Sequence, residues 1–125
     1  MKARIALVLA GAVVLSVLVF TATAFALSAT KVTIKGPDGD FHGKIFSSNT
    51  HCLGGRVVRV FMSTDNGSTW QRIGSDTSSR NGSYGTWSIG NSGYRDGLFY
   101  ARATRTTSCR GGKSPTIELV NGVPQ

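Results

Sequence analysis

The stretch that most constrains the fold is residues 56–73, RVVRVFMSTDNGSTWQRI. Apolar side chains recur at every second position before the turn, with Val58, Val60 and Met62 on one face and Arg59 on the other. This period of two in β-branched and aromatic residues indicates a strand. The TDNGST segment that follows is dense in turn formers. The stretch therefore predicts a β-hairpin around which other strands assemble.

The turn of this hairpin carries a specific spacing, S-x-D-x-G-x-T-W, formed by Ser63, Asp65, Gly67, Thr69 and Trp70. An Asp at the start of a tight turn can accept hydrogen bonds from backbone N–H groups just ahead of it. Gly67 can adopt positive φ, and Trp70 supplies a large apolar surface that can pack over the turn. We expect these residues to make a turn that fixes the hairpin register.

The spacing resembles the Asp-box, the hairpin turn repeated around the blades of sialidases and related propellers. In that family the motif is mainly structural and lies away from the catalytic centre. A propeller needs at least about four blades of four strands, whereas this chain has one copy in 125 residues. The resemblance therefore implies a structural turn in preference to a ligand-contacting loop, and we expect no sialidase.

The first 26 residues have the pattern of a secretory signal peptide. Lys2 and Arg4 precede an apolar run over residues 5–20, and the small-x-small sequence AFA at 24–26 follows. We expect cleavage after Ala26, with cleavage after Ala24 as a second option. The alternative is an uncleaved membrane anchor over residues 5–27. Cleavage leaves residues 27–125 as a secreted protein with 12 Lys and Arg against 6 Asp and Glu.

The mature chain is long enough for one domain, and it has no helical periodicity. Short apolar-alternating runs spaced roughly 8–12 residues apart are typical of a two-sheet sandwich. We expect an all-β, immunoglobulin-like sandwich of about seven short antiparallel strands in residues 27–120, followed by a C-terminal tail at 121–125. The seven runs are residues 30–35, 41–47, 56–63, 69–73, 84–89, 98–104 and 115–120.

Two cysteines remain, Cys52 and Cys109. An even count in a secreted chain predicts a disulfide, and two cysteines permit one intramolecular pairing. The chain-entropy model gives such a long loop roughly 4 kcal/mol of stabilisation. Free thiols or a metal site are the alternative, but no CxxC spacing is present.

The layout resembles small secreted bacterial β-sandwich modules of immunoglobulin-like or transthyretin-like type. The matching pieces are residues 41–47, the Cys52-x-x-Gly55-Arg56-x-Val58 segment, residues 82–87, and GLFYA at 97–101. This resemblance implies a module that binds or spaces other molecules. It transfers no binding residue to this chain.

No catalytic constellation is visible. His42 and His51 are the only histidines, no G-x-S-x-G segment exists, and the six acidic residues are scattered. Asp38 and Asp40 in GPDGD could offer oxygens to calcium, but neither that loop nor the segment at Asp65 supplies a full ligand set. We therefore expect no enzyme, no cofactor and no metal.

The basic residues carry the functional hypothesis. Arginine outnumbers lysine in the mature chain, and its planar fork suits phosphate, sulfate and carboxylate groups. The sequence suggests an anion-binding set in the last third of the chain, near Tyr94 and Tyr100, against the alternative of a solvated basic surface. The set is Arg95, Arg102, Arg105, Arg110 and Lys113.

These residues predict an extracellular binding or interaction module for anionic polymers or glycans. The alternatives are a structural envelope-associated protein without a specific ligand, or an inhibitor of a secreted enzyme that uses the loops at 74–83 and 106–114. Salt-resistant binding to one glycan would instead indicate Trp70, Trp87 or Tyr100 as the site. We expect a monomer with no specific nucleic-acid partner and with membrane association only through an uncleaved N-terminus.

Overall fold

The computed structural model describes residues 26–125. The expected signal peptide therefore lies outside the described residues, apart from Ala26. Ten strands and two three-residue 3-10 helices make up the described chain. The strands are β1 (Lys31–Val32), β2 (Asp40–Phe46), β3 (Val57–Ser63), β4 (Gln71–Thr77), β5 (Ser79–Asn81), β6 (Tyr84–Asn91), β7 (Gly97–Ala103), β8 (Gly112–Lys113), β9 (Ile117–Val120) and β10 (Val123–Pro124), and the helices are η1 (Pro37–Gly39) and η2 (Thr50–Cys52).

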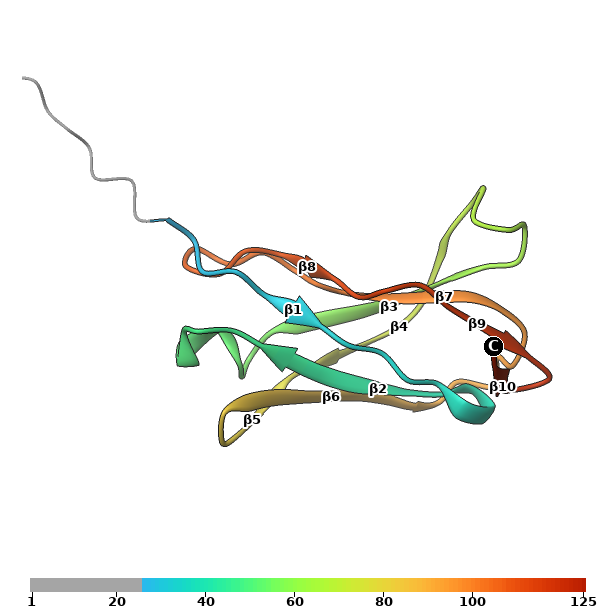
Figure 1. Ribbon diagram of the computed structural model, residues 1–125, viewed down its shortest axis with the longest axis horizontal. Coiled ribbons are helices and arrows are strands. Elements are labelled where there is room, and N and C mark those ends of the chain that lie inside the picture. The colour runs from blue at the N-terminus through green and yellow to red at the C-terminus, as the bar shows by residue number, and fades with distance from the viewer. Residues whose placement is uncertain (1–25) are drawn as a thin grey trace, which may run out of the picture.

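The strands form two antiparallel sheets, which confirms the expected two-sheet sandwich. The smaller sheet has the order β1-β2-β6-β5, and the larger has the order β10-β9-β7-β3-β4 with β8 paired to β7. Figure 1 shows the two sheets as layers, with β2 and β6 in one and β3, β7 and β9 in the other. The β3–β4 turn projects beyond the body of the sandwich in the same view.

The core lies between the layers and follows the alternation seen in the sequence. Val58 and Val60 on β3 are fully buried, as is Phe99 on β7. Phe41 of the smaller sheet meets Phe99 of the larger sheet with 4.5 Å between ring centroids. Burial of aromatic and β-branched side chains between the sheets is the main force that holds the layers together.

The expectation that residues 74–83 form a flexible loop is wrong. The segment forms the end of β4 and then β5, so one continuous stretch leaves the larger sheet and joins the smaller one. Buried Ser78 lies at the corner, where its hydroxyl donates to the Leu53 carbonyl (2.7 Å) and accepts from the Arg56 amide (3.0 Å). The serine supplies hydrogen bonds where the chain changes sheets, and a polar composition here does not mean disorder.

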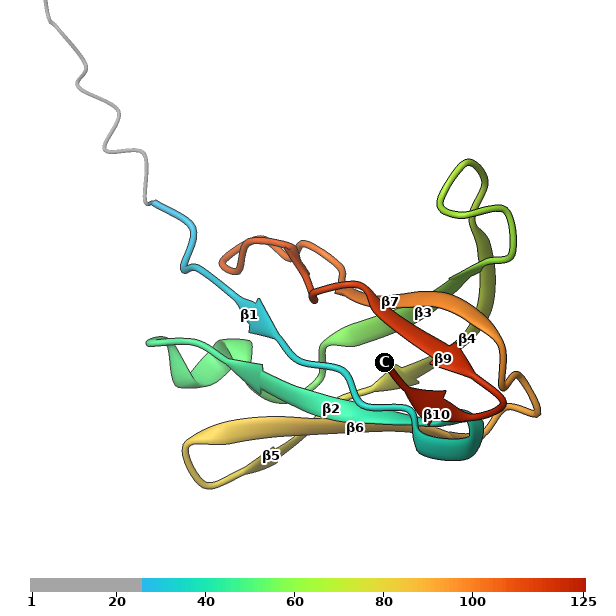
Figure 2. The same ribbon diagram turned by 45° about the vertical axis from the view of Figure 1, so that its right-hand side comes forward.

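The expected C-terminal tail is also wrong. Val123 pairs with Val120 and Pro124 with Leu119, so β10 closes a hairpin with β9. The turn is Asn121-Gly122, with φ of 51° and 78°, and positive φ at both positions is the signature of a two-residue hairpin turn. Figure 2 shows β10 next to η1, which anchors the end of the chain to the sandwich.

The disulfide between Cys52 and Cys109 is confirmed. Cys52 ends η2, Cys109 lies between β7 and β8, and their Cα atoms are 5.7 Å apart. Both cysteines are buried. The bond therefore closes the end of the sandwich at which β3 begins and β7 ends.

Arg56 lies buried beside the disulfide, although its charge suggested a surface position. Its guanidinium donates to the backbone carbonyls of Cys52 (3.0 Å), Thr104 (3.0 Å) and Arg110 (2.8 Å), and to the Thr30 hydroxyl (3.0 Å). Burial lowers the pKa of Arg56. One side chain thus connects the N-terminal segment with both sides of the disulfide.

Among residues 26–125, no helix is long and apolar enough to cross a membrane.

Candidate functional site

Three cations form a row across the outer face of the larger sheet. Arg59 on β3 pairs in register with Arg102 on β7, and Arg102 pairs with Lys113 on β8. All three alternate with core residues along their strands, so their side chains share the solvent face. Of the five residues in the expected anion-binding set, the fold thus brings Arg102 and Lys113 together and adds Arg59 to them.

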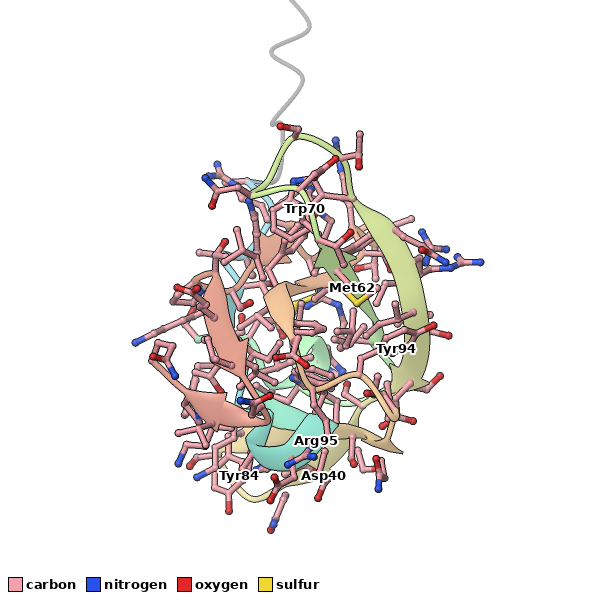
Figure 3. All side chains as sticks on the ribbon, turned by 90° about the vertical axis from the view of Figure 1, so that its right-hand side faces the viewer. Asp40, Met62, Trp70, Tyr84, Tyr94 and Arg95 are labelled. Atoms are coloured by element: carbon pink, nitrogen blue, oxygen red, sulfur yellow. A yellow bond between two sulfur atoms is a disulfide. The ribbon has the colours of Figure 1, made fainter. Side chains whose placement is uncertain are left out.

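Arg95 is not part of this row. Its guanidinium pairs with Asp38 (3.1 Å) and donates to the Asn121 carbonyl (2.9 Å). Figure 3 shows Arg95 far below Trp70, at the opposite side of the view. Arg95 therefore holds η1 against the β9–β10 turn, and its charge is already matched by a carboxylate.

Arg105 and Arg110 lie in the loop between β7 and β8, which carries Cys109. Both side chains are exposed. The backbone carbonyl of Arg110 accepts hydrogen bonds from Arg56 and Thr30, so this residue helps to build the disulfide end. The residues of the expected anion-binding set therefore lie in three parts of the fold: the row on the larger sheet, the pair of Arg95 with Asp38, and the loop between β7 and β8.

An aromatic cluster lies next to the cationic row. Phe61 stacks on Tyr100 with 5.0 Å between ring centroids and 21° between planes. The edge of Trp70 meets Tyr100 at 4.7 Å and 70°. The ammonium of Lys113 lies 4.3 Å from the centre of the Tyr100 ring, within the range of a cation–π contact. Arg72 pairs with Phe61 from the neighbouring strand β4.

These residues share one surface, which we call the aromatic–cationic face. Its aromatic rings are half-buried, and Arg72, Arg102 and Lys113 are exposed. The face consists of Arg59, Phe61, Trp70, Arg72, Tyr100, Arg102 and Lys113.

The cations of this face have no carboxylate partner. Within residues 26–125 the only ion pair is that of Arg95 with Asp38. Glu118 lies on the same side of the sheet, opposite Leu98, but it makes no ion pair there. The face therefore carries four positive charges without an ion-pair partner, three of them on exposed side chains, next to flat apolar rings.

The β3–β4 turn supports Trp70 at the edge of this face. Asp65 accepts from the Ser63 hydroxyl (2.7 Å), the Thr69 amide (2.8 Å) and the Thr69 hydroxyl. The Ser63 hydroxyl in turn accepts from the Gly67 amide (2.8 Å). Hydrogen bonds from Thr69 above all, and from Ser63, lower the pKa of Asp65 to about 2.

Gly67 has φ of 90°, which a side chain would penalise. A Cβ at this position would lie 3.7 Å from the Trp70 ring, so the ring lies over the turn. The five turn residues therefore act together to close the hairpin and to hold the indole against Tyr100.

The charge count in the sequence did not identify Arg59, Phe61 or Arg72 as part of a site. Arg59 and Arg102 are far apart in the chain and meet only through the pairing of β3 with β7. The alternating pattern of each strand did predict that these side chains point outward. That pattern places a residue on one face of its strand, but it does not give the order of the strands in the sheet.

The histidines and acids do not assemble into a reactive group among the described residues. The His42 ring binds the Asp40 carbonyl (3.0 Å), and the structure places no three of His, Cys, Asp and Glu close enough to hold a metal within residues 26–125. Both oxygens of Asp65 accept hydrogen bonds from within the turn.

Comparisons with protein-family models, with curated proteins and with solved structures find no match for this chain.

Proposed function

We propose that this protein is a secreted, non-enzymatic binding module that holds anionic polymers, in particular acidic polysaccharides, on the aromatic–cationic face. The observation that carries the proposal is the row of Arg59, Arg102 and Lys113, which lie in register and have no carboxylate partner. Like charges directly opposite each other in a sheet destabilise it. An anion bound between them removes that repulsion, which gives a physical reason for a partner.

The aromatic cluster favours a polysaccharide over a simple inorganic anion. Tyr100 and Trp70 offer flat apolar surfaces against which sugar rings can pack, while arginine forks bind carboxylate or sulfate groups. The cations and the rings lie in neighbouring cross-strand positions of the same face. A polymer with an acidic group on successive sugars can therefore contact both.

We further propose that the sandwich is of the immunoglobulin-like or transthyretin-like type and that its β3–β4 turn is Asp-box-like. The hydrogen bonds of Asp65 with Thr69 and Ser63 support a structural role for the turn. The disulfide and the signal-peptide pattern of the N-terminus support secretion.

A binding assay on immobilised polymers tests the proposal. We expect the purified protein to bind an acidic polysaccharide at about 0.05 M salt, to lose most of that binding at about 1 M salt, and to ignore a neutral glucan. The Arg59→Gln/Arg102→Gln double variant should lower affinity by at least tenfold.

Arg105→Gln is the matched control, because it removes one exposed positive charge outside the face. If Arg105→Gln weakens binding as much as Arg102→Gln alone, attraction depends on net charge and the face is not the site. Failure to bind any polymer would instead favour the structural role. One-to-one binding of a secreted enzyme would favour the inhibitor, which would have to use the disulfide-bonded loop between β7 and β8.

A further inference from the structure

The outer face of the smaller sheet carries a groove of about 470 Å³. It is lined by residues of β2, by the segment between β1 and η1, and by two residues of β6. Its volume is within the range of pockets that hold small ligands. The rim residues are Thr33, Lys35, His42, Lys44, Phe46 and Thr86.

This groove is separate from the aromatic–cationic face. Figure 3 shows Tyr84, which belongs to the smaller sheet, and Trp70 at opposite sides of the molecule. No residue is shared between the two surfaces. An inference about the groove therefore does not depend on the function proposed above.

Gly43 and Trp87 also line the groove, and they leave a hydrogen-bond donor without a partner. Trp87 is 3% exposed, and its Nε1 makes no hydrogen bond. A Cβ at residue 43 would lie only 2.8 Å from this nitrogen, so glycine is needed for the indole to take its place. A buried donor without an acceptor costs free energy, and such groups call for an explanation.

The charge of the groove is positive. Lys35 and Lys44 are exposed and lie diagonally across the antiparallel pairing of their strands, in which Lys35 pairs with His42 and Thr33 with Lys44. No acidic residue lines the groove, and neither lysine forms an ion pair within residues 26–125. Lys44 lies 4.5 Å from the centre of the Tyr84 ring. With two positive charges and no negative one, the groove favours an anionic ligand.

The remaining rim groups can form hydrogen bonds with ligand hydroxyls and pack against a ligand ring. Because a carbonyl only accepts, the His42 Nδ1 that binds the Asp40 carbonyl carries the hydrogen, which leaves Nε2 as the ring nitrogen available to a ligand. The Thr33 hydroxyl accepts from the Lys44 amide (2.9 Å), so its own hydrogen is free to donate. Phe46 is 38% exposed and offers an apolar surface.

We propose that this groove binds a single acidic sugar residue, with its carboxylate between Lys35 and Lys44 and its ring against Phe46. The hydroxyls exchange hydrogen bonds with His42 and Thr33. The bound sugar covers the part of the groove that Gly43 and Trp87 line, so the environment of the Trp87 indole N–H reports binding.

A titration of ¹⁵N-labelled protein with D-glucuronate, followed by NMR, tests this assignment. The chain has two tryptophans, so two indole N–H signals are expected, and Trp70→Phe assigns them. We expect the Trp87 signal to move in a saturable way, with the same midpoint in the unaltered protein and in Trp70→Phe. D-Glucose, which has the ring without the carboxylate, should bind at least tenfold more weakly.

Variants of the two lysines locate the carboxylate. Lys35→Gln and Lys44→Gln should each weaken glucuronate binding about three- to fivefold, which corresponds to the worth of one exposed charge pair. Arg105→Gln is the matched control, because it removes an exposed positive charge that belongs neither to the groove nor to the aromatic–cationic face. Its affinity should equal that of the unaltered protein.

Three results would overturn the proposal. They are a Trp87 signal that does not move at the highest glucuronate concentration tested, an affinity for glucose equal to that for glucuronate, and a loss of affinity in Arg105→Gln as large as that in Lys35→Gln. Since the lysines are exposed, their variants are expected to fold, and the dispersion of the same NMR spectra verifies that they do.

Discussion

Arg59 and Arg102 lie directly opposite each other on neighbouring antiparallel strands of the larger sheet. Within residues 26–125, no carboxylate forms an ion pair with either arginine. Cross-strand pairs of like charge lower the stability of a sheet, by up to about 1 kcal/mol. An anion bound between the two arginines would reduce their repulsion and so stabilise the fold.

The first prediction concerns this repulsion. Arg102→Gln should raise the free energy of unfolding by about 0.2–0.5 kcal/mol at low ionic strength, because it removes the like-charge pair. The gain should disappear near 1 M salt, where charges are screened within about 3 Å. Urea unfolding at the two salt concentrations measures both values. A destabilised variant at low salt would show that packing of the Arg102 stem matters more than its charge.

The second prediction concerns Asp65 and acid. Its pKa in the folded protein is about 2, below the value near 3.9 of an unfolded Asp, so the ionised carboxylate favours the folded state. This contribution is complete above about pH 4 and is lost as the pH falls toward 2. Thermal unfolding between pH 2 and 6 should show a smaller loss on acidification for Asp65→Asn than for the unaltered protein.

The control for this prediction is Asp96→Asn, which changes a carboxylate outside the turn. Its acid response should match that of the unaltered protein more closely than Asp65→Asn does. Equal acid profiles for Asp65→Asn and the unaltered protein would contradict a role for the Asp65 charge in stabilising the turn.

Much of the core could be predicted from the sequence, because burial follows a local pattern. The alternation of Val58, Val60 and Met62 places them inside, and all three are buried. The pairing of Cys52 with Cys109 followed from their number alone. The last hairpin carried a signal of the same local kind in Asn121-Gly122, but the proximity of the chain end favoured a tail over a turn.

The candidate site was harder to predict from the sequence than the core, because it depends on the order of the strands. Arg102 and Lys113 become neighbours of Arg59 only when β7 pairs with both β3 and β8. Arg95, which had the same charge in the same third of the chain, pairs with Asp38 at another edge. Charge alone also gave no reason to bury Arg56, whose partners are mostly backbone carbonyls that no side-chain pattern reveals.

The third prediction concerns the disulfide. Its 57-residue separation gives an expected loss of roughly 4 kcal/mol of stability on replacement of both cysteines by serine. For a domain of this size that loss is a large part of the total. Denaturant unfolding of the Cys52→Ser/Cys109→Ser variant measures it. A loss below about 1 kcal/mol would mean that Arg56 and the surrounding hydrogen bonds hold this end of the sandwich without the covalent link.

The fourth prediction concerns Arg56 itself. Arg56→Met keeps much of the volume but removes the donors to the carbonyls of Cys52, Thr104 and Arg110. The Arg110 carbonyl keeps its hydrogen bond from the Thr30 hydroxyl, so two carbonyls are left without this donor. A buried acceptor without a partner costs about 1–3 kcal/mol, so we expect a loss of at least about 2 kcal/mol. Arg56→Lys should recover only part of it, because one ammonium cannot reproduce a planar fork with several fixed donors.

The exposed Arg80→Met variant is the matched control for Arg56→Met and should change stability by less than about 0.5 kcal/mol. Hydrogen exchange of the amides around Thr104 and Arg110 then separates the two possible causes of a loss. If Arg56 acts by joining these segments, their protection should fall more in Arg56→Met than the global loss of stability explains. If Arg56→Lys were as stable as the unaltered protein, a positive charge alone would suffice and the fork geometry would have no part in holding the disulfide end together.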